Sequence, residues 1–91
     1  MTDWTRATEI AHAILLHLAD DPELIAQLCT ETGLDPADLR ATTGDAGFVA
    51  AMLDFIAADD RRLLDFAASQ GVAPETIARL RQAVEAGFVH P

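Results

Sequence analysis

One pair of side chains near the start of the sequence has a spacing that suits metal coordination. Glu9 and His12 form a Glu-x-x-His step, which places a carboxylate and an imidazole on one face of a helix, as in carboxylate-bridged metal sites. Such a site needs a second step of this kind and two further carboxylates, and the sequence contains no second step. His17 points about 140° away from His12 on a helix, and His90 lies in a tail that we expect to be frayed. We therefore predict no metal site and no cofactor.

The other reactive residue types form no catalytic group. Cys29, the single cysteine, falls in an apolar helical stripe, which favours a buried and inert thiol over a nucleophile. One cysteine also excludes an intramolecular disulfide, and with it a secreted disulfide scaffold. The five glycines are isolated at helix ends or, at Gly44 and Gly47, around a turn, so they form no phosphate-binding loop. Because no nucleophile, base and orienting group can be named, we expect no enzymatic activity.

The elements that carry these residues are all predicted to be helices. Apolar residues recur at helical spacing almost throughout, and no stretch has the alternation of β-branched and aromatic residues that a half-buried strand needs. The first helix is predicted over residues 3–19. Asp-Pro pairs at 21–22 and 35–36 begin a second helix, which Gly33 ends, and a short third helix that carries Leu39.

The rest of the chain continues this helical pattern. A dense apolar stripe over residues 48–56 predicts a fourth helix. Asp59 or Asp60 begins a fifth helix, which ends at Gly71, and Pro74 begins a sixth. The turns between these helices are short, and no Gly/Ser-rich linker divides the chain.

Length and composition favour one folded domain. The 91 residues are 51% apolar and 23% charged, which supports a modest core and argues against disorder despite a net charge of −9. We predict a single all-α domain over residues 1–91, a compact bundle of five to six short helices with an ordered core at residues 5–86. The N-terminal apolar run is too short to span a bilayer and lacks the features of a signal peptide, so we expect a cytoplasmic protein.

Two stretches of the chain resemble each other. LADDPELIAQLCTETGLDPADL, from Leu18, matches AADDRRLLDFAASQGVAPETI, from Ala57, in the order of an Asp-Asp pair, a helix, a glycine and a proline. Aligning the two Asp-Asp pairs leaves the second glycine one position early, which predicts that the second copy has lost one residue within its helix. Either the chain is a pseudo-duplicated three-helix unit, or similar capping signals recur wherever short helices meet.

The second of these stretches has the spacing of a helix-turn-helix corner. Ala67 lets the second helix pack closely, Gly71 takes a left-handed turn, and Val72, Ile77 and Leu80 seal the corner. This pattern is specific for the geometry of two angled helices and weak as a signal for DNA. A helix-turn-helix-type protein that associates with nucleic acid is therefore the alternative function.

The charge of the chain is unevenly distributed. Residues 1–58 hold ten acidic residues and two arginines, a net charge of −8, whereas residues 59–91 hold five acidic residues and four arginines, a net charge of −1. Binding through phosphate charge usually needs about 6–10 basic contacts, so we do not expect nucleic-acid binding from so few. In the competing interpretation the arginines of the second part pair at helical spacing with Asp65 and Glu85.

The capping and core residues also form a pattern along the whole chain. It includes the Asp-Pro pair after the first helix, the string TGLDPADLR at residues 32–40, the apolar helix at 48–56, and Gly71 with Pro74. Over residues 5–86 the chain resembles a family of short bacterial proteins classed only as a domain of unknown function. The resemblance implies a compact helical bundle with no established activity, and it implies no catalytic or binding residue.

The residues left as candidates for function are exposed aromatic and basic side chains. Trp4 and Phe88, lone aromatics near the two ends of the domain, either fold back on the core or dock a partner. We predict a non-catalytic protein–protein interaction module whose partner is another protein; the partner's identity and the oligomeric state stay open. The predicted interaction surface consists of Trp4, Arg61, Arg62, Arg79, Arg81 and Phe88.

Overall fold

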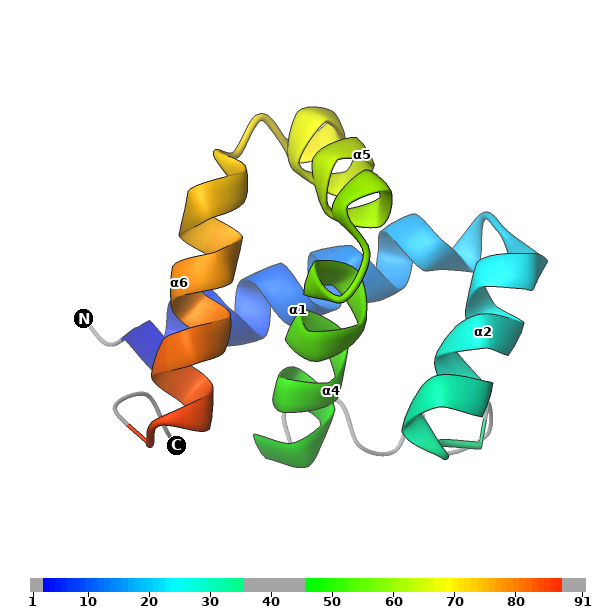
Figure 1. Ribbon diagram of the computed structural model, residues 1–91, viewed down its shortest axis with the longest axis horizontal. Helices are drawn as coiled ribbons and strands as arrows, with labels where there is room; N and C mark the ends of the chain where they lie inside the picture. The colour runs from blue at the N-terminus through cyan, green and yellow to red at the C-terminus, as the bar shows by residue number, and fades with distance from the viewer. Residues whose placement is uncertain (1–2, 36–45, 88–91) are drawn as a thin grey trace.

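The computed structural model describes residues 3–35 and 46–87, and most of these residues lie in five α-helices (Figure 1). In chain order the helices are α1 (Asp3–Ala19), α2 (Pro22–Thr32), α4 (Ala46–Ala57), α5 (Asp60–Gln70) and α6 (Pro74–Glu85). No strand occurs in the two described ranges, so the predicted all-α fold is confirmed. The predicted short helix with Leu39, and the tail with Phe88 and His90, lie outside the described residues.

Helix α4 lies at the centre of the fold because its sequence is apolar on several sides. It buries six side chains, a pattern typical of a helix surrounded by protein: Phe48, Val49, Met52, Leu53, Phe55 and Ile56. Each of the other four described helices packs against α4. Figure 1 shows α1 crossing behind α4 and α6, with α2 and α6 on opposite sides of α4. The buried side chains of the described helices therefore form a common core around α4.

Helices α2 and α5 begin and end with the same capping groups. Oδ1 of Asp21 accepts hydrogen bonds from the backbone N–H groups two and three residues later, at 3.0 and 3.4 Å. At the start of α5, Asp59 rather than Asp60 accepts the equivalent pair, at 2.9 and 3.2 Å. Gly33 (φ 75°) and Gly71 (φ 65°) end the two helices in the left-handed conformation, which glycine adopts without a steric penalty.

These caps place the two halves of the chain in a constant register. The spacing from Asp21 to Asp59 equals the spacing from Gly33 to Gly71, and α2 and α5 both have 11 residues. The predicted loss of one residue in the second copy is therefore wrong, because the second aspartate of one Asp-Asp pair and the first of the other act as caps. The same register relates buried side chains, namely Ile14 to Met52, Leu18 to Ile56, and Leu28 to Phe66. The third helix of the first copy falls in the segment that is not described, so two helices of each predicted unit can be compared.

At the corner between α5 and α6, the structure has the predicted left-handed turn at Gly71 and buries several of the residues predicted to pack there. Beyond Gly71, the backbone N–H of Val72 donates a hydrogen bond to the carbonyl of Ala67 at 3.0 Å. Ala67 and Ile77 are buried, and Val72 is half-buried against the core. The small and aliphatic positions of the motif are therefore explained by the way the two helices pack.

Candidate functional site

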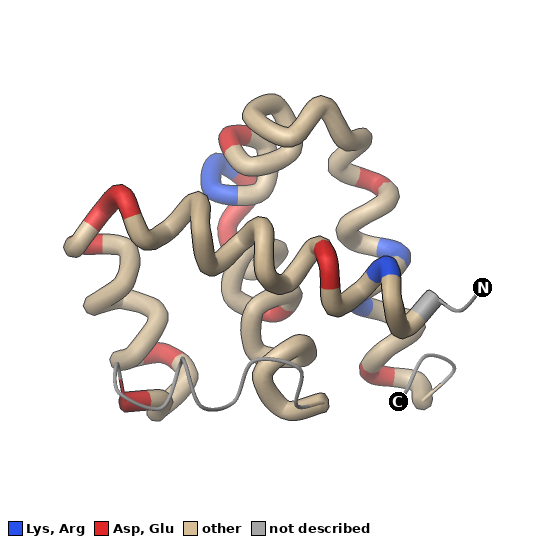
Figure 2. The backbone as a smooth tube through the Cα atoms, turned by 180° about the vertical axis from the view of Figure 1, so that it is seen from behind, with Lys and Arg blue, Asp and Glu red and all other residues tan. Residues whose placement is uncertain are grey.

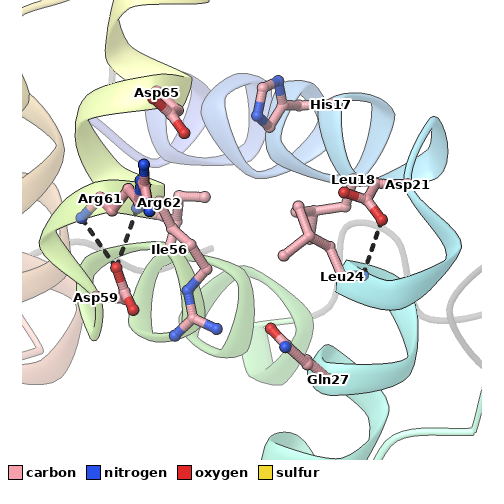
Figure 3. Close-up of a pocket in the computed structure, with 10 residues that line it drawn as sticks. All are labelled: His17, Leu18, Asp21, Leu24, Gln27, Ile56, Asp59, Arg61, Arg62 and Asp65. Atoms are coloured by element: carbon pink, nitrogen blue, oxygen red, sulfur yellow. Dashed lines mark hydrogen bonds between the residues drawn. The ribbon is translucent and has the colours of Figure 1, made fainter.

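A pocket of about 270 Å³ opens between two corners of the fold, the turn from α1 to α2 and the turn from α4 to α5 (Figure 3). Each corner supplies five of the ten lining residues. The first corner contributes His17, Leu18, Asp21, Leu24 and Gln27, and the second contributes Ile56, Asp59, Arg61, Arg62 and Asp65. The pocket therefore exists only where the two halves of the chain meet.

The constant register of the two halves relates most of the lining. Eight of the ten residues form four pairs at equivalent positions: Leu18 with Ile56, Asp21 with Asp59, Leu24 with Arg62, and Gln27 with Asp65. Figure 3 shows the members of these pairs on opposite sides of the pocket. Both members of the first pair are aliphatic, and both members of the second are acidic. In the last two pairs, the first half of the chain has an uncharged residue and the second half has a charged one. The pocket is thus built from equivalent positions with unequal charge.

The base of the pocket is apolar and fixed by the core. Leu18 and Ile56 are both buried, and Leu24 is half-buried against the same cluster. Close packing holds such side chains in place, so this base is pre-formed. A ligand that enters would pass the charged groups at the rim and then meet this aliphatic surface.

The aspartates of the pocket differ in how much of their hydrogen-bonding capacity is used. Asp21 and Asp59 each use Oδ1 to cap a helix. Asp65 forms no hydrogen bond or ion pair with another residue that the structure describes, so its predicted pairing with an arginine at helical spacing is not found. The predicted pairing of Arg81 with Glu85 is confirmed, at 3.3 Å.

Arg62 is more enclosed than the sequence predicts, because 14% of its side chain is exposed. Its guanidinium carbon lies 3.9 Å from the centre of the Phe55 ring, and Nη1 lies 3.4 Å from Oε2 of Glu31. The Nε atom is buried and has no hydrogen-bond partner among the described residues. Arg62 therefore joins α5 to α4 and α2, and its charge is already partly neutralised.

His17 connects α1 to α5 at the edge of the pocket. Its ring meets the buried Phe66 ring edge-on, with centroids 5.5 Å apart and an angle of 74°. Nδ1 lies 3.5 Å from Oγ of Ser69, and the Ser69 hydroxyl donates to the Phe66 carbonyl at 2.8 Å. Sequence reasoning missed His17 as a pocket residue; its place shortly before the first Asp-Asp pair was the only available signal.

The other predicted surface residues lie away from this pocket. Arg79 is exposed on α6, and Arg81 contacts Asp54 on α4 at 2.7 Å. The hydrogen bond from Arg81 to Asp54 raises the pKa of Arg81. Trp4 is half-buried and packs against the core, as the fold-back interpretation expects, whereas Phe88 lies outside the described residues. Figure 2 shows the basic positions of α5 and those of α6 on separate parts of the backbone.

Three further features concern metal, thiol and membrane chemistry. Glu9 and His12 belong to no group of three His, Cys, Asp or Glu side chains among residues 3–35 and 46–87, and the His12 ring lies 6.1 Å from that of Phe48. Cys29 is a free thiol, half-buried against the core. Within the described part of the chain, no helix has both the length and the apolar character to cross a membrane.

Comparison with known proteins identifies a family and adds no activity. A family model described as "Protein of unknown function (DUF3572)" matches residues 5–87. No curated protein and no solved structure matches the chain. The matched range includes every residue of the pocket and confirms the resemblance that the capping and core residues carry.

Proposed function

Because the chain belongs to the DUF3572 family, whose description names no activity, we propose a function from the site itself: a non-catalytic module that docks another protein at the pocket between its two corners. The observation that carries this proposal is the pocket's size together with its lining. At about 270 Å³ it is smaller than the roughly 300–1,000 Å³ that encloses a drug-sized ligand. It has room for one side chain of a partner, inserted between the two turns.

The lining of the pocket supports recognition rather than chemistry. The capping hydrogen bonds hold Asp21 and Asp59 to the backbone, and Arg62 is held by Phe55 and Glu31. Side chains fixed in this way form a rigid rim around an apolar base, which lowers the entropy lost when a partner binds. A composition with a single cysteine is consistent with a cytoplasmic setting for such a module, which we also propose.

Nucleic-acid binding by the α5–α6 corner is the second candidate, and the charges favour it less. Of the four arginines it needs, Arg62 contacts Glu31 and Arg81 contacts Asp54 and Glu85. Arginines engaged in this way offer fewer contacts to phosphate groups. An NMR titration with short duplex DNA at low salt separates the two candidates. Nucleic-acid binding should change the chemical shifts of the α5–α6 corner, whereas protein docking alone should leave them unchanged.

Site-specific photo-crosslinking tests the docking proposal directly. A benzophenone side chain is placed at Gln27, an exposed position on the rim, and as a control at Gln82, an exposed position on α6 outside the pocket. Irradiation in the native host should give a discrete adduct from Gln27 that protease digests and nuclease does not, and no such adduct from Gln82. Equal adducts at both positions, or none at either, contradict docking at the pocket. A nuclease-sensitive adduct supports the second candidate.

A further inference from the structure

We propose that the side chain received by the pocket is basic, an arginine or a lysine of the partner protein; this inference rests on the docking function proposed above. The pocket combines an apolar base with carboxylates at its rim. A lysine or arginine combines an aliphatic stem with a terminal cation, and its stem can lie along the apolar base while the cation turns back to the carboxylates at the rim. The pocket and a basic side chain therefore match in the distribution of apolar and polar groups and in the sign of their charges.

The charges around the pocket favour a cation. Three carboxylates line it, those of Asp21, Asp59 and Asp65, together with two guanidinium groups, and Glu31 adds a fourth carboxylate by its contact with Arg62. Four acidic groups against two basic ones leave two uncompensated negative charges. Arg61 is the only lining guanidinium that no carboxylate contacts among the described residues.

The carboxylates of the lining keep most of their capacity to accept hydrogen bonds. Asp65 has no partner among the described residues, and the caps at Asp21 and Asp59 use Oδ1 and leave Oδ2 free. Nε of Arg62 is an unpartnered donor that is buried and closed to an entering group, whereas the exposed guanidinium of Arg61 has no side-chain partner among the described residues and stays available as a donor. Since ammonium and guanidinium groups are donors only, they complement these free acceptors, whereas a carboxylate or phosphate would face three like charges and a single unpaired guanidinium, that of Arg61.

The two turns place these acceptors on opposite sides of the entrance. Figure 3 shows Asp21 on one side of the pocket and Asp59 and Asp65 on the other. A cation between them is therefore reached from both halves of the chain, while its stem lies along Leu18 and Ile56. The pocket thus recognises a long basic side chain at two places: the rim carboxylates contact its cation, and the apolar base contacts its aliphatic stem.

Blocked amino acids test this inference on the isolated protein. Nitrogen-15 NMR spectra are recorded with N-acetyl-arginine methylamide, with the lysine equivalent, and with the citrulline equivalent, which has nearly the shape of arginine without its charge. The arginine and lysine probes should shift resonances of the pocket, with dissociation constants on the order of 1 mM. The citrulline probe and an N-acetyl-glutamate methylamide probe should leave them unchanged.

A matched pair of variants locates the contact. Asp65→Asn removes the unpartnered carboxylate of the lining, whereas Asp60→Asn removes an exposed carboxylate of the same helix that is not part of the pocket. The first variant should weaken the arginine probe about two- to fivefold, as expected for an exposed charge pair, and the second should change it by less than about 1.5-fold. Thermal unfolding of both variants checks that the fold is retained.

The outcomes separate this inference from the docking function. Three results would overturn the inference that the pocket binds a basic side chain. These are equal binding of the arginine and citrulline probes, stronger binding of the glutamate probe, and equal effects of the two variants. A protein adduct at Gln27 without binding of either basic probe overturns this inference alone. Binding of the basic probes without any protein adduct overturns docking of a protein and leaves a pocket for a free basic molecule.

Discussion

Replacing Asp59 by alanine should destabilise the protein more than the same replacement of Asp21, although the two residues cap equivalent helices. Each accepts two backbone hydrogen bonds, at 2.9 and 3.2 Å for Asp59 and at 3.0 and 3.4 Å for Asp21. Loss of such a cap costs about 1 kcal/mol, within a range of about 0.5–2 kcal/mol. The geometry alone thus predicts similar losses.

The difference comes from the charges in the first turn of each helix. Helix α2 begins with Pro22 and Glu23, which both favour a helix start, and these remain when Asp21 is removed. Helix α5 also has an acidic residue in its first turn, Asp60, but it places Arg61 and the partly neutralised Arg62 where positive charge opposes the helix dipole, at about 0.3–1 kcal/mol for an exposed charge such as Arg61. The carboxylate of Asp59 offsets part of this cost. We therefore expect a loss of about 1.5–2 kcal/mol for Asp59→Ala and of about 0.5–1 kcal/mol for Asp21→Ala.

Urea denaturation followed by far-ultraviolet circular dichroism measures this difference. With a slope of about 1 kcal/mol per molar urea for a small domain, Asp59→Ala should lower the midpoint by about 1.5–2 M and Asp21→Ala by about 0.5–1 M. Asp59→Asn is the control, because asparagine keeps the capping acceptor and removes the charge. It should retain about half of the stability lost in Asp59→Ala, because the other half of that loss comes from the charge.

Two results would refute this reasoning. If Asp21→Ala is as destabilising as Asp59→Ala, the charges of the first turn do not distinguish the helices. If Asp59→Asn loses as much stability as Asp59→Ala, the effect is one of charge, and the capping hydrogen bonds contribute little.

Three further substitutions and one fluorescence measurement on the unchanged protein test the packing, the turn and the surface contacts. Phe66→Ala should cost about 3–5 kcal/mol because the ring is fully buried, and a loss under about 2 kcal/mol in urea denaturation would contradict its place in the core. Gly71→Ala should cost about 1–2 kcal/mol through backbone strain alone, since a Cβ at this position meets no atom within 4 Å; an unchanged melting temperature would contradict the left-handed turn. Arg81→Gln should cost about 0.2–1 kcal/mol at low salt and less at high salt, because its contact with Asp54 is partly exposed, and a loss that salt does not reduce would contradict an ion pair. Emission from Trp4 should be shifted to the blue of that in the urea-unfolded chain, since its ring packs against the core, and coincident spectra would contradict this.

The described helices were predictable because their ends carry strong local signals. The Asp-Pro pair at 21–22, Gly33 and Gly71 each impose a backbone conformation through their own covalent structure. The same signals misled the alignment of the two halves. The sequence of an Asp-Asp pair does not show which aspartate accepts the backbone hydrogen bonds. The second aspartate caps α2 and the first caps α5, so an alignment of the two pairs shifts the register of the halves by one residue.

The pocket could not be predicted in this way because it depends on contacts between distant residues. The sequence suggested exposed arginines at the start of α5, yet Phe55 and Glu31 enclose Arg62. Whether Arg62 is free or held depends on where α2 and α4 lie relative to α5, which local spacing does not contain. The constant register of the two halves, had it been recognised, would have pointed to the corners that Asp21 and Asp59 cap.

The crossing of α1 and α4 has a consequence for how the chain folds. Each of these helices belongs to a different half, and α1, whose apolar face includes the buried Ala11 and Ile14, packs more extensively against α4 than against any other described helix. A polypeptide ending near residue 40 would leave that face in water, and its short helices would be marginal on their own. Synthesis must therefore pass α4 before the first half gains a stable partner, and we expect the finished chain to unfold in one cooperative transition.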